Sequence, residues 1–249
     1  MAKTHELNPD QSDTIVAVAT PPGEGAVAIV RLSGPACRSI LEGIFHPVAG
    51  RVSWQSHRMV LGWVKGERPL DQALAVWMQA PYTYTRDDVV EFHLHGSPAL
   101  ARAVVDLCLE RGARLARPGE FTLRAFLNGR LDLAQAESVM QLVAARTQAQ
   151  LEQAAGSLGG LFSAQVESLR GQLLDWLAQL EAELDFGDEV APMEATEAER
   201  RLETLTRQAE ALIRGAETGR LQAEGARVAL VGPPNAGKST LLNRILEEE

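Results

Sequence analysis

The nine residues from Gly232 to Thr240 constrain this chain more than any other stretch. Their sequence, Gly-Pro-Pro-Asn-Ala-Gly-Lys-Ser-Thr, fits the phosphate-loop pattern G-x-x-x-x-G-K-[ST]. The apolar run Arg227–Val231 precedes the loop and predicts a buried strand, and helix-forming residues follow over Ser239–Leu246. Because strand, loop and helix come in the order that the pattern requires, we expect 226–249 to begin an α/β nucleotide-binding domain.

The residue types of the loop explain how it would bind a phosphate. Gly232 and Gly237 let successive backbone N–H groups turn toward a polyphosphate. Lys238 then reaches the β- and γ-phosphates, and the Ser239 hydroxyl ligates Mg²⁺. An ordinary glycine turn before a helix does not need Lys and Ser at this spacing. Only nine residues follow Thr240, so we expect no nucleotide hydrolysis by this piece and assign no catalytic residue within it.

Charge and cysteine content exclude several classes of protein. The net charge is −9, and residues 1–135 carry 14 basic against 14 acidic side chains, whereas 136–249 carry 10 against 19. This distribution argues against a generally basic nucleic-acid surface. Cys37 and Cys108 are too few for a disulfide framework or a zinc site, which favours buried free thiols. With no long apolar run and no signal-peptide core, we expect a cytoplasmic protein without a membrane segment.

Strand and helix patterns alternate over residues 1–118 and predict a compact α+β domain. Two helices are expected to start with a capping serine followed by a proline in the first turn, at Ser33-Gly34-Pro35 and at Ser97-Pro98. The expected strands are Thr14–Ala19, Ala26–Leu32, Arg58–Val64, Ala73–Met78, Val89–Leu94 and Arg114–Ala116, and the expected helices are Ala36–Phe45 and Ala99–Arg111.

Four polar residues stand out in this domain. Arg31 ends an otherwise apolar strand, where it is either a surface arginine or a functional one. Glu91, His93 and His95 alternate along one strand and therefore share a face. They are consistent with a metal site, with a polar wall of a ligand pocket or with a solvated face. The sequence offers no third element with ligands, which favours the last two.

Residues 119–225 form a predicted helical domain. A helix is expected over Glu120–Leu127, and Asp132 with Gln135 resembles a capping box that starts a further helix from Leu133 to about Ser157. Gly156 or the Gly159-Gly160 pair is expected to interrupt that helix.

Two amphipathic stripes then predict an antiparallel pair of helices in a bundle, each about 28 residues and about 42 Å long. The second helix is expected to start at a capping box of Thr196 and Glu199 and to lead through Leu221–Gly225 into the strand before the phosphate loop. The stripes are Val166, Leu169, Leu173, Trp176, Leu180 and Leu184, then Leu202, Leu205, Ala209, Leu212 and Ala216.

Four dispersed motifs resemble one family. The loop Gly232–Ser239 is similar to the G-x-P-N-x-G-K-S form of bacterial GTPases related to Era. The stretch from Asp13 to Gly23, with Asp-Thr-Ile-Val-Ala and Ala-Thr-Pro-Pro-Gly, resembles the tRNA modification GTPase family MnmE, also called TrmE. So do Arg117–Phe121 and Ala125–Glu137, and all four occur in the family's order.

The resemblance implies a fold, a function and partners. It implies a folate-binding N-terminal domain similar to that of aminomethyltransferases, which also forms a homodimer, followed by a helical domain into which a GTPase domain is inserted. Members of the family work with a flavin-dependent partner, MnmG (GidA). Together they add a carboxymethylaminomethyl group to the wobble uridine of certain tRNAs, with 5-formyl- or methylene-tetrahydrofolate as one-carbon donor. GTP hydrolysis with Mg²⁺ and K⁺ drives movement of the GTPase domains.

The resemblance also assigns roles to residues. It implies folate contacts at Arg31, Glu91 and Arg130, Mg²⁺ at Ser239 and K⁺ at Asn235. The GTP-binding residues would be Asn235, Ala236, Gly237, Lys238, Ser239 and Thr240. The family's Asp-x-x-Gly metal motif, Asn-Lys-x-Asp guanine loop and C-terminal Cys-x-Gly-Lys tail have no counterpart here.

Two other functions compete with this interpretation. One is a folate-binding dimerisation or assembly module without catalysis of its own. The other is a free-standing folate-dependent methyltransferase, against which the phosphate loop argues, since such an enzyme has no use for one.

Overall fold

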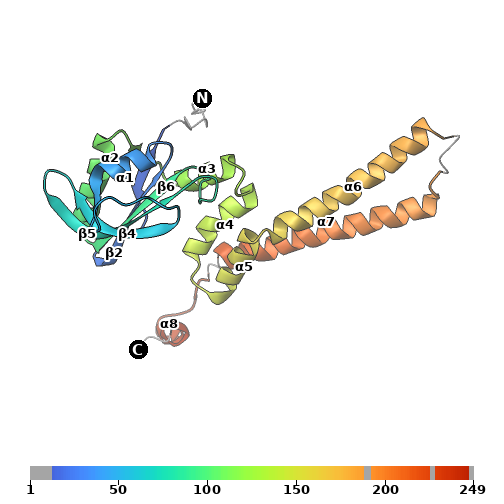
Figure 1. Cartoon of the computed structure of the whole chain (residues 1–249). Helices are drawn as coiled ribbons and strands as arrows, with labels where there is room; N and C mark the ends of the chain where they lie inside the picture. Colours follow the sequence, from blue (N-terminus) through green and yellow to red (C-terminus); the bar gives the residue numbers. More distant parts are fainter. Residues whose placement is uncertain (1–12, 188–191, 225–227, 247–249) are drawn as a thin grey trace, which may run out of the picture. The chain divides into compact units, whose positions relative to one another are not determined.

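The structure is a computed structural model that describes residues 13–187, 192–224 and 228–246. It divides into two compact units, Met1–Glu137 and Ser138–Glu249 (Figure 1). The predicted division into three domains, at 1–118, 119–225 and 226–249, stays a proposal. In the part of the chain that the structure describes, no helix has the length and apolar content needed to cross a membrane.

The first unit is built on a seven-stranded sheet in the order β3-β4-β5-β6-β2-β1-β7. Neighbouring strands are antiparallel except β1 and β7, which are parallel. The strands are β1 (Ile15–Val18), β2 (Gly25–Ser33), β3 (Phe45–Pro47), β4 (Arg58–Lys65), β5 (Pro69–Met78), β6 (Val89–Gly96) and β7 (Arg114–Leu115). The six strands predicted for residues 1–118 are all present, but β3 was not foreseen and β5 begins earlier than expected.

Two helices, α1 (Cys37–Ile44) and α2 (Pro98–Glu110), pack on one face of this sheet (Figure 1). Side chains on successive strand residues point to opposite faces, so every second residue of β2 and β6 enters the core. Val30, Leu32, Phe92 and Leu94 are buried beneath the helices. The predicted α+β class is confirmed for this unit, and the polar residues of β2 and β6 lie on the face opposite the helices.

The two predicted helix starts have different outcomes. At α2 the prediction is confirmed, because the Ser97 hydroxyl accepts the Leu100 N–H at 3.4 Å. At α1 it is wrong, since the helix starts at Cys37 after Ala36, which makes no side-chain cap. Ser33 instead ends β2 and hydrogen-bonds through its hydroxyl to Thr85 Oγ1 at 2.7 Å.

A buried arginine, Arg124, joins helix α3 (Glu120–Leu127) to the sheet. Its guanidinium is fully buried and donates to the backbone oxygens of Asp13 and Ser33, at 3.0 and 3.2 Å, and to the Asp13 carboxylate. Arg114 also binds Asp13 and forms a two-pronged ion pair with Glu120, at 2.5 and 2.9 Å. This network holds α3 where β1 begins and β2 ends.

Both cysteines are buried free thiols, as predicted. Burial raises the pKa of Cys37 far above its ordinary value and that of Cys108 to about 12. The Cys37 thiol donates to the backbone oxygen of Asp88 at 3.2 Å. Both residues therefore act as small hydrophobic side chains of the core.

For the helices after α3, one predicted start is confirmed and one predicted helix length is wrong. The Asp132–Gln135 capping box is confirmed, with both reciprocal bonds at 2.9 Å, and α4 (Leu133–Ala144) follows it. The expected continuous helix to Ser157 is wrong, because Thr147 caps a new helix, α5 (Gln148–Leu158), through a full capping box with Gln150. Gly159 ends α5, as the predicted interruption required.

Two long helices of the second unit form the predicted antiparallel pair, but the predicted burial of the apolar stripe on the first of them is wrong, because none of its residues is buried. They are α6 (Leu161–Asp185) and α7 (Ala195–Glu224), of 25 and 30 residues. Gln172 bonds to Gln208 at 3.2 Å, and Arg201 donates to Gln179 at 2.9 Å, so the helices run antiparallel (Figure 1). The capping box at Thr196 is wrong, because α7 already begins at Ala195.

The strand expected before the phosphate loop is absent from the described residues. Val228–Val231 has no strand pairing and Val231 is 92% exposed, while Arg227 and Gly225 lie outside the described residues. A strand exists only as part of a hydrogen-bonded ladder, and the described residues of the second unit contain no strand that could pair with this segment. Helix α8 (Lys238–Leu246) does follow the loop.

We predict that Arg124→Met lowers the stability of the first unit by about 3–5 kcal/mol, because the backbone oxygens of Asp13 and Ser33 lose their donor and the Asp13 carboxylate keeps only Arg114 as its partner. Urea unfolding followed by tryptophan fluorescence measures this in a Trp176→Phe background, where the remaining tryptophans all belong to the first unit. Arg102→Met is the control, since the Arg102 side chain is 80% exposed. Equal stability of the two variants would contradict the role assigned to Arg124.

A second prediction concerns acid stability. The bonds from Arg114 hold the pKa of Glu120 below its ordinary value, so the unfolded chain takes up this proton more readily than the folded one. The stabilisation is therefore complete above about pH 5 and is lost as the pH falls below about 4.3 toward the folded-state pKa. Glu120→Gln removes this part of the pH dependence. Urea midpoints between pH 6 and 3 measure it, and parallel curves for the two proteins would refute the coupling.

Candidate functional site

Two of the predicted folate residues face each other across neighbouring strands. Arg31 of β2 and Glu91 of β6 are register partners, and Arg31 Nε donates to Glu91 Oε1 at 2.7 Å. Their side chains are 30% and 15% exposed, so the pair is sheltered but reachable. A carboxylate has two oxygens with about four acceptor positions. Glu91 therefore keeps acceptor capacity for a ligand beside the ion pair.

The two histidines of β6 have separate partners. His93 Nε2 lies 3.2 Å from Glu91 Oε2, on the same face as Arg31. His95 Nδ1 bonds to Asp71 Oδ1 at 2.6 Å, and Asp71 also accepts the His95 backbone N–H. Among the residues with a described placement, no three His, Cys, Asp or Glu side chains converge as a metal site. The geometry favours the polar-wall interpretation of this strand.

Tyr84 connects this pair to the third predicted residue, Arg130. The Arg31 guanidinium carbon lies 5.8 Å from the Tyr84 ring centre, and that of Arg130 lies 5.7 Å from it. Arg31 also lies 5.8 Å from the ring of Phe121, and the Tyr84 hydroxyl bonds to Thr122 at 3.0 Å. Contacts of this kind are attractive because the aromatic face is negative. The structure thus brings Arg31, Glu91 and Arg130 together around one tyrosine.

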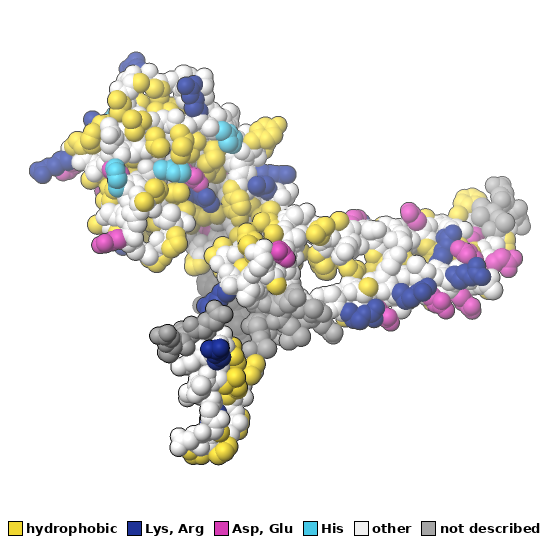
Figure 2. Space-filling view, turned by 90° about the horizontal axis from the view of Figure 1, so that it is seen from below, with side chains coloured by type: hydrophobic (Ala, Val, Ile, Leu, Met, Phe, Trp, Pro, Cys, Tyr) yellow, Lys and Arg dark blue, Asp and Glu magenta, His cyan; other side chains and the backbone are white. Residues whose placement is uncertain are grey.

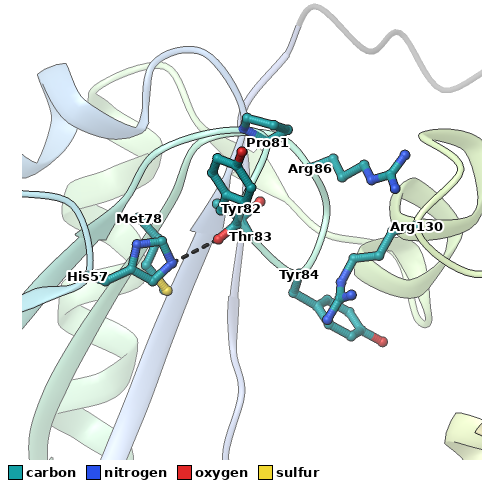
Figure 3. A pocket seen from close by; sticks show the side chains of 8 residues that line it. All are labelled: His57, Met78, Pro81, Tyr82, Thr83, Tyr84, Arg86 and Arg130. Carbon is teal, nitrogen blue, oxygen red and sulfur yellow. Dashed lines mark hydrogen bonds between the residues drawn. The ribbon is translucent and has the colours of Figure 1, made fainter. Parts of the chain in front are cut away.

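An open pocket of about 460 Å³ lies beside Tyr84 (Figure 3). Its size falls within the usual range for small-molecule sites. Tyr84 and Arg130 belong to its wall, whereas Arg31 and Glu91 do not line it. The lining residues are His57, Met78, Pro81, Tyr82, Thr83, Tyr84, Arg86 and Arg130.

The phosphate loop makes a tight turn directly before α8. Asn235 and Gly237 have positive φ values of 62° and 80°, and α8 starts directly afterwards at Lys238. The Lys238 ammonium donates to the backbone oxygens of Gly232 and Pro233 at 3.0 and 2.7 Å. The Lys238 side chain is therefore folded back over the loop. The helix start adds its positive dipole end to the same place.

The remaining loop residues are accessible. Asn235, Ala236, Ser239 and Thr240 are exposed, so their amides and hydroxyls can reach a ligand. Ser239 offers a hydroxyl oxygen and Asn235 an amide oxygen, and hard cations such as Mg²⁺ and K⁺ are bound by oxygen ligands. No carboxylate of the described residues approaches Lys238.

Sequence reasoning missed the residues that join the site together. Tyr84 and Arg86 lie in a loop with no periodic pattern, and Phe121 and Thr122 lie at the start of α3. Asp87 in that loop binds Asn128, and burial raises the pKa of its carboxyl although Arg124 opposes the shift. The run Tyr82-Thr-Tyr-Thr-Arg86 combines aromatic and basic side chains, and this combination is the sequence signal that could have marked the loop as a binding loop.

Two family models match consecutive parts of the chain. The model described as the GTP-binding protein TrmE N-terminus matches residues 14–130, and the one described as the MnmE helical domain matches 133–245. Both come from the same family, in the order in which the four motifs occur. Together they cover both compact units.

Curated relatives agree over nearly the whole chain. A "tRNA modification GTPase MnmE" of Synechococcus sp. (strain JA-3-3Ab) is 48% identical over 242 residues, which is 96% of this chain and 53% of the relative. Proteins of the same name from Synechococcus sp. (strain JA-2-3B'a(2-13)) and Heliobacterium modesticaldum are 49% and 46% identical, over 93% and 95% of this chain. The chain spans about half the length of these relatives. By its motifs, its two family models and these identities, the chain belongs to the MnmE (TrmE) family.

Proposed function

We propose that this chain forms the folate-binding and helical parts of a GTP-hydrolysing tRNA modification protein, together with its phosphate loop. The observation that carries the proposal is the Arg31–Glu91 ion pair and its link through Tyr84 to Arg130. A pterin ring has adjacent N–H donors on one edge, which match the acceptors of a carboxylate. The glutamate end of the same molecule carries carboxylates, which match a guanidinium.

Each side chain has a task in this proposal. Glu91 accepts from the pterin edge, and Arg31 holds the Glu91 carboxylate ionised and in place. Tyr84 and Phe121 offer aromatic surface beside it, and Arg130 attracts the acidic end of the ligand. Folate supplies the one-carbon unit when bound, while these residues bind it and fix its orientation.

The proposal extends to the whole protein through its relatives. These are named tRNA modification GTPases, and the phosphate loop of this chain has the residue types for GTP, Mg²⁺ and K⁺. We propose the family's reaction for the complete protein, namely carboxymethylaminomethyl transfer to wobble uridine of tRNA together with the flavin-dependent MnmG. The tRNA and MnmG are the partners that this reaction requires.

The exposed face of the sheet supports the proposal that the first unit forms a homodimer. Met59, Leu61, Trp63 and Leu74 share the face opposite α1 and α2 and are 38–49% exposed. Figure 2 shows hydrophobic side chains gathered on this unit. An exposed apolar face of this kind is typical of a protein interface. The same face supports the second candidate function, a folate-binding assembly module without catalysis of its own.

We predict that 5-formyltetrahydrofolate binds the chain and that Glu91→Gln weakens binding at least about tenfold, because a carboxylate that accepts two hydrogen bonds is replaced by an amide. Isothermal titration calorimetry measures both affinities. Arg102→Gln is the control and should bind like the parent protein. Circular dichroism verifies that Glu91→Gln folds. Unchanged affinity in this variant, or no binding by the parent, would overturn the folate assignment.

We also predict that the 249-residue chain does not release phosphate from GTP faster than Lys238→Ala. Phosphoryl transfer needs a metal-holding carboxylate and a group that positions water, in addition to a phosphate loop. Phosphate release with Mg²⁺ and KCl present measures the rate for both proteins. Turnover of the parent chain above that of Lys238→Ala would contradict this prediction, and it would place the missing groups within these 249 residues.

A further inference from the structure

The pocket beside Tyr84 contains two arginines without an acidic partner among the described residues. Arg86 and Arg130 both line it, and neither forms an ion pair with a carboxylate that the structure places. The carboxylates next to Arg86 in the sequence are engaged elsewhere. Asp88 accepts from the Ala80 N–H and Trp77 Nε1, and Asp87 accepts from Asn128. Two arginines without a described acidic partner therefore line one cavity.

Arg86 is held in an unusual position. Its φ is 61°, in the left-handed region that long side chains seldom adopt. One of its terminal nitrogens donates to the backbone oxygen of Asn128 at 2.9 Å. This bond fixes the side chain against the end of α3, next to the segment that carries Arg130 (Figure 3). A guanidinium has five N–H donors, and most of those of Arg86 stay available for a ligand.

The rest of the wall suits a flexible ligand with both apolar and acidic parts. Tyr82 is 81% exposed, and its backbone oxygen accepts from His57 Nε2 at 2.8 Å. Met78 and Pro81 add apolar surface. Tyr84 lies between this pocket and the Arg31–Glu91 pair, so a ligand anchored at Glu91 can extend past Arg130 toward Arg86.

We propose that this pocket binds the glutamyl chain of a polyglutamylated folate, with Arg86 as the residue that recognises its additional carboxylates. The inference rests on the proposed folate function and names the form of folate that the site selects. Each added glutamyl residue brings one more carboxylate, and arginine pairs with carboxylates through two parallel N–H···O bonds. Arg130 contacts the first glutamate, and Arg86 the next ones.

Carboxylates fit the pocket better than the phosphates of an RNA strand. Residues 1–135 carry as many acidic as basic side chains, whereas an RNA surface is an extended basic tract. Arg86 and Arg130 line one pocket of limited volume rather than an extended tract. An oligonucleotide that competes with the ligand is therefore an outcome that would count against the proposal.

The test compares two ligands that differ only in the number of glutamates. 5-Formyltetrahydrofolate and its triglutamate are titrated calorimetrically into the full chain at about 50 mM and 300 mM salt. We expect the triglutamate to bind about fivefold or more tightly at low salt, with a smaller advantage at high salt, because paired charges are screened. In Arg86→Gln the two ligands should bind with affinities within about twofold of each other.

Arg102→Gln removes the same charge from α2 and should keep the triglutamate advantage. Equal affinities of the two ligands for the parent would overturn the inference and leave the folate function standing. If Arg102→Gln also lost the tighter binding of the triglutamate, that tighter binding would be due to net charge, and the inference would be overturned. Displacement of the triglutamate by a short single-stranded RNA would identify the pocket as an RNA site instead. Absence of binding by either ligand would refute the folate function and the inference together.

Discussion

The buried guanidinium of Arg124 is the constraint on which the first unit depends. A fully buried charge is costly unless hydrogen bonds and a nearby opposite charge offset its loss of water. Asp13 supplies that charge, and backbone oxygens of Asp13 and Ser33 accept further bonds. The Arg124 contacts therefore form only when three segments meet: the start of β1, the end of β2 and the middle of α3. The position of α3 then determines where Phe121, Thr122 and, just after the helix, Arg130 lie.

This arrangement explains how residues remote in the sequence form one site. Arg31 and Glu91 are brought together by the pairing of β2 with β6. Arg130 reaches the same region because Arg124 and the Arg114–Glu120 pair hold α3 against the sheet. The loop around Tyr84 joins the two parts, and Asn128 ties this loop to the end of α3 through the backbone oxygen of Thr85 at 2.6 Å. The shape of the site thus depends on polar contacts rather than on the apolar core.

The sequence predicted the strands of the sheet well because their apolar residues alternate with period two. Periodicity did not reveal the break between α4 and α5, since the apolar pattern continues through it. The signal there was local, in the capping box of Thr147 and Gln150. Family resemblance pointed to Arg31, Glu91 and Arg130, but Tyr84 and Arg86 had no pattern to mark them. Their importance follows from tertiary contacts, which depend on the position of α3. The strand expected at Val228–Val231 needs a neighbouring strand, which a local pattern cannot supply.

The paired glutamines of the α6–α7 hairpin have a consequence for how its length can change in evolution. From Gln172 to Gln179 is seven residues forward in α6, and from Gln208 to Arg201 is seven residues back in α7. Seven residues make two turns of a helix, so each contact recurs on the same side. A deletion in one helix alone would rotate its later residues away from their partners. Natural variation in the length of this rod should therefore come in matched pairs of two-turn blocks, one block from each helix.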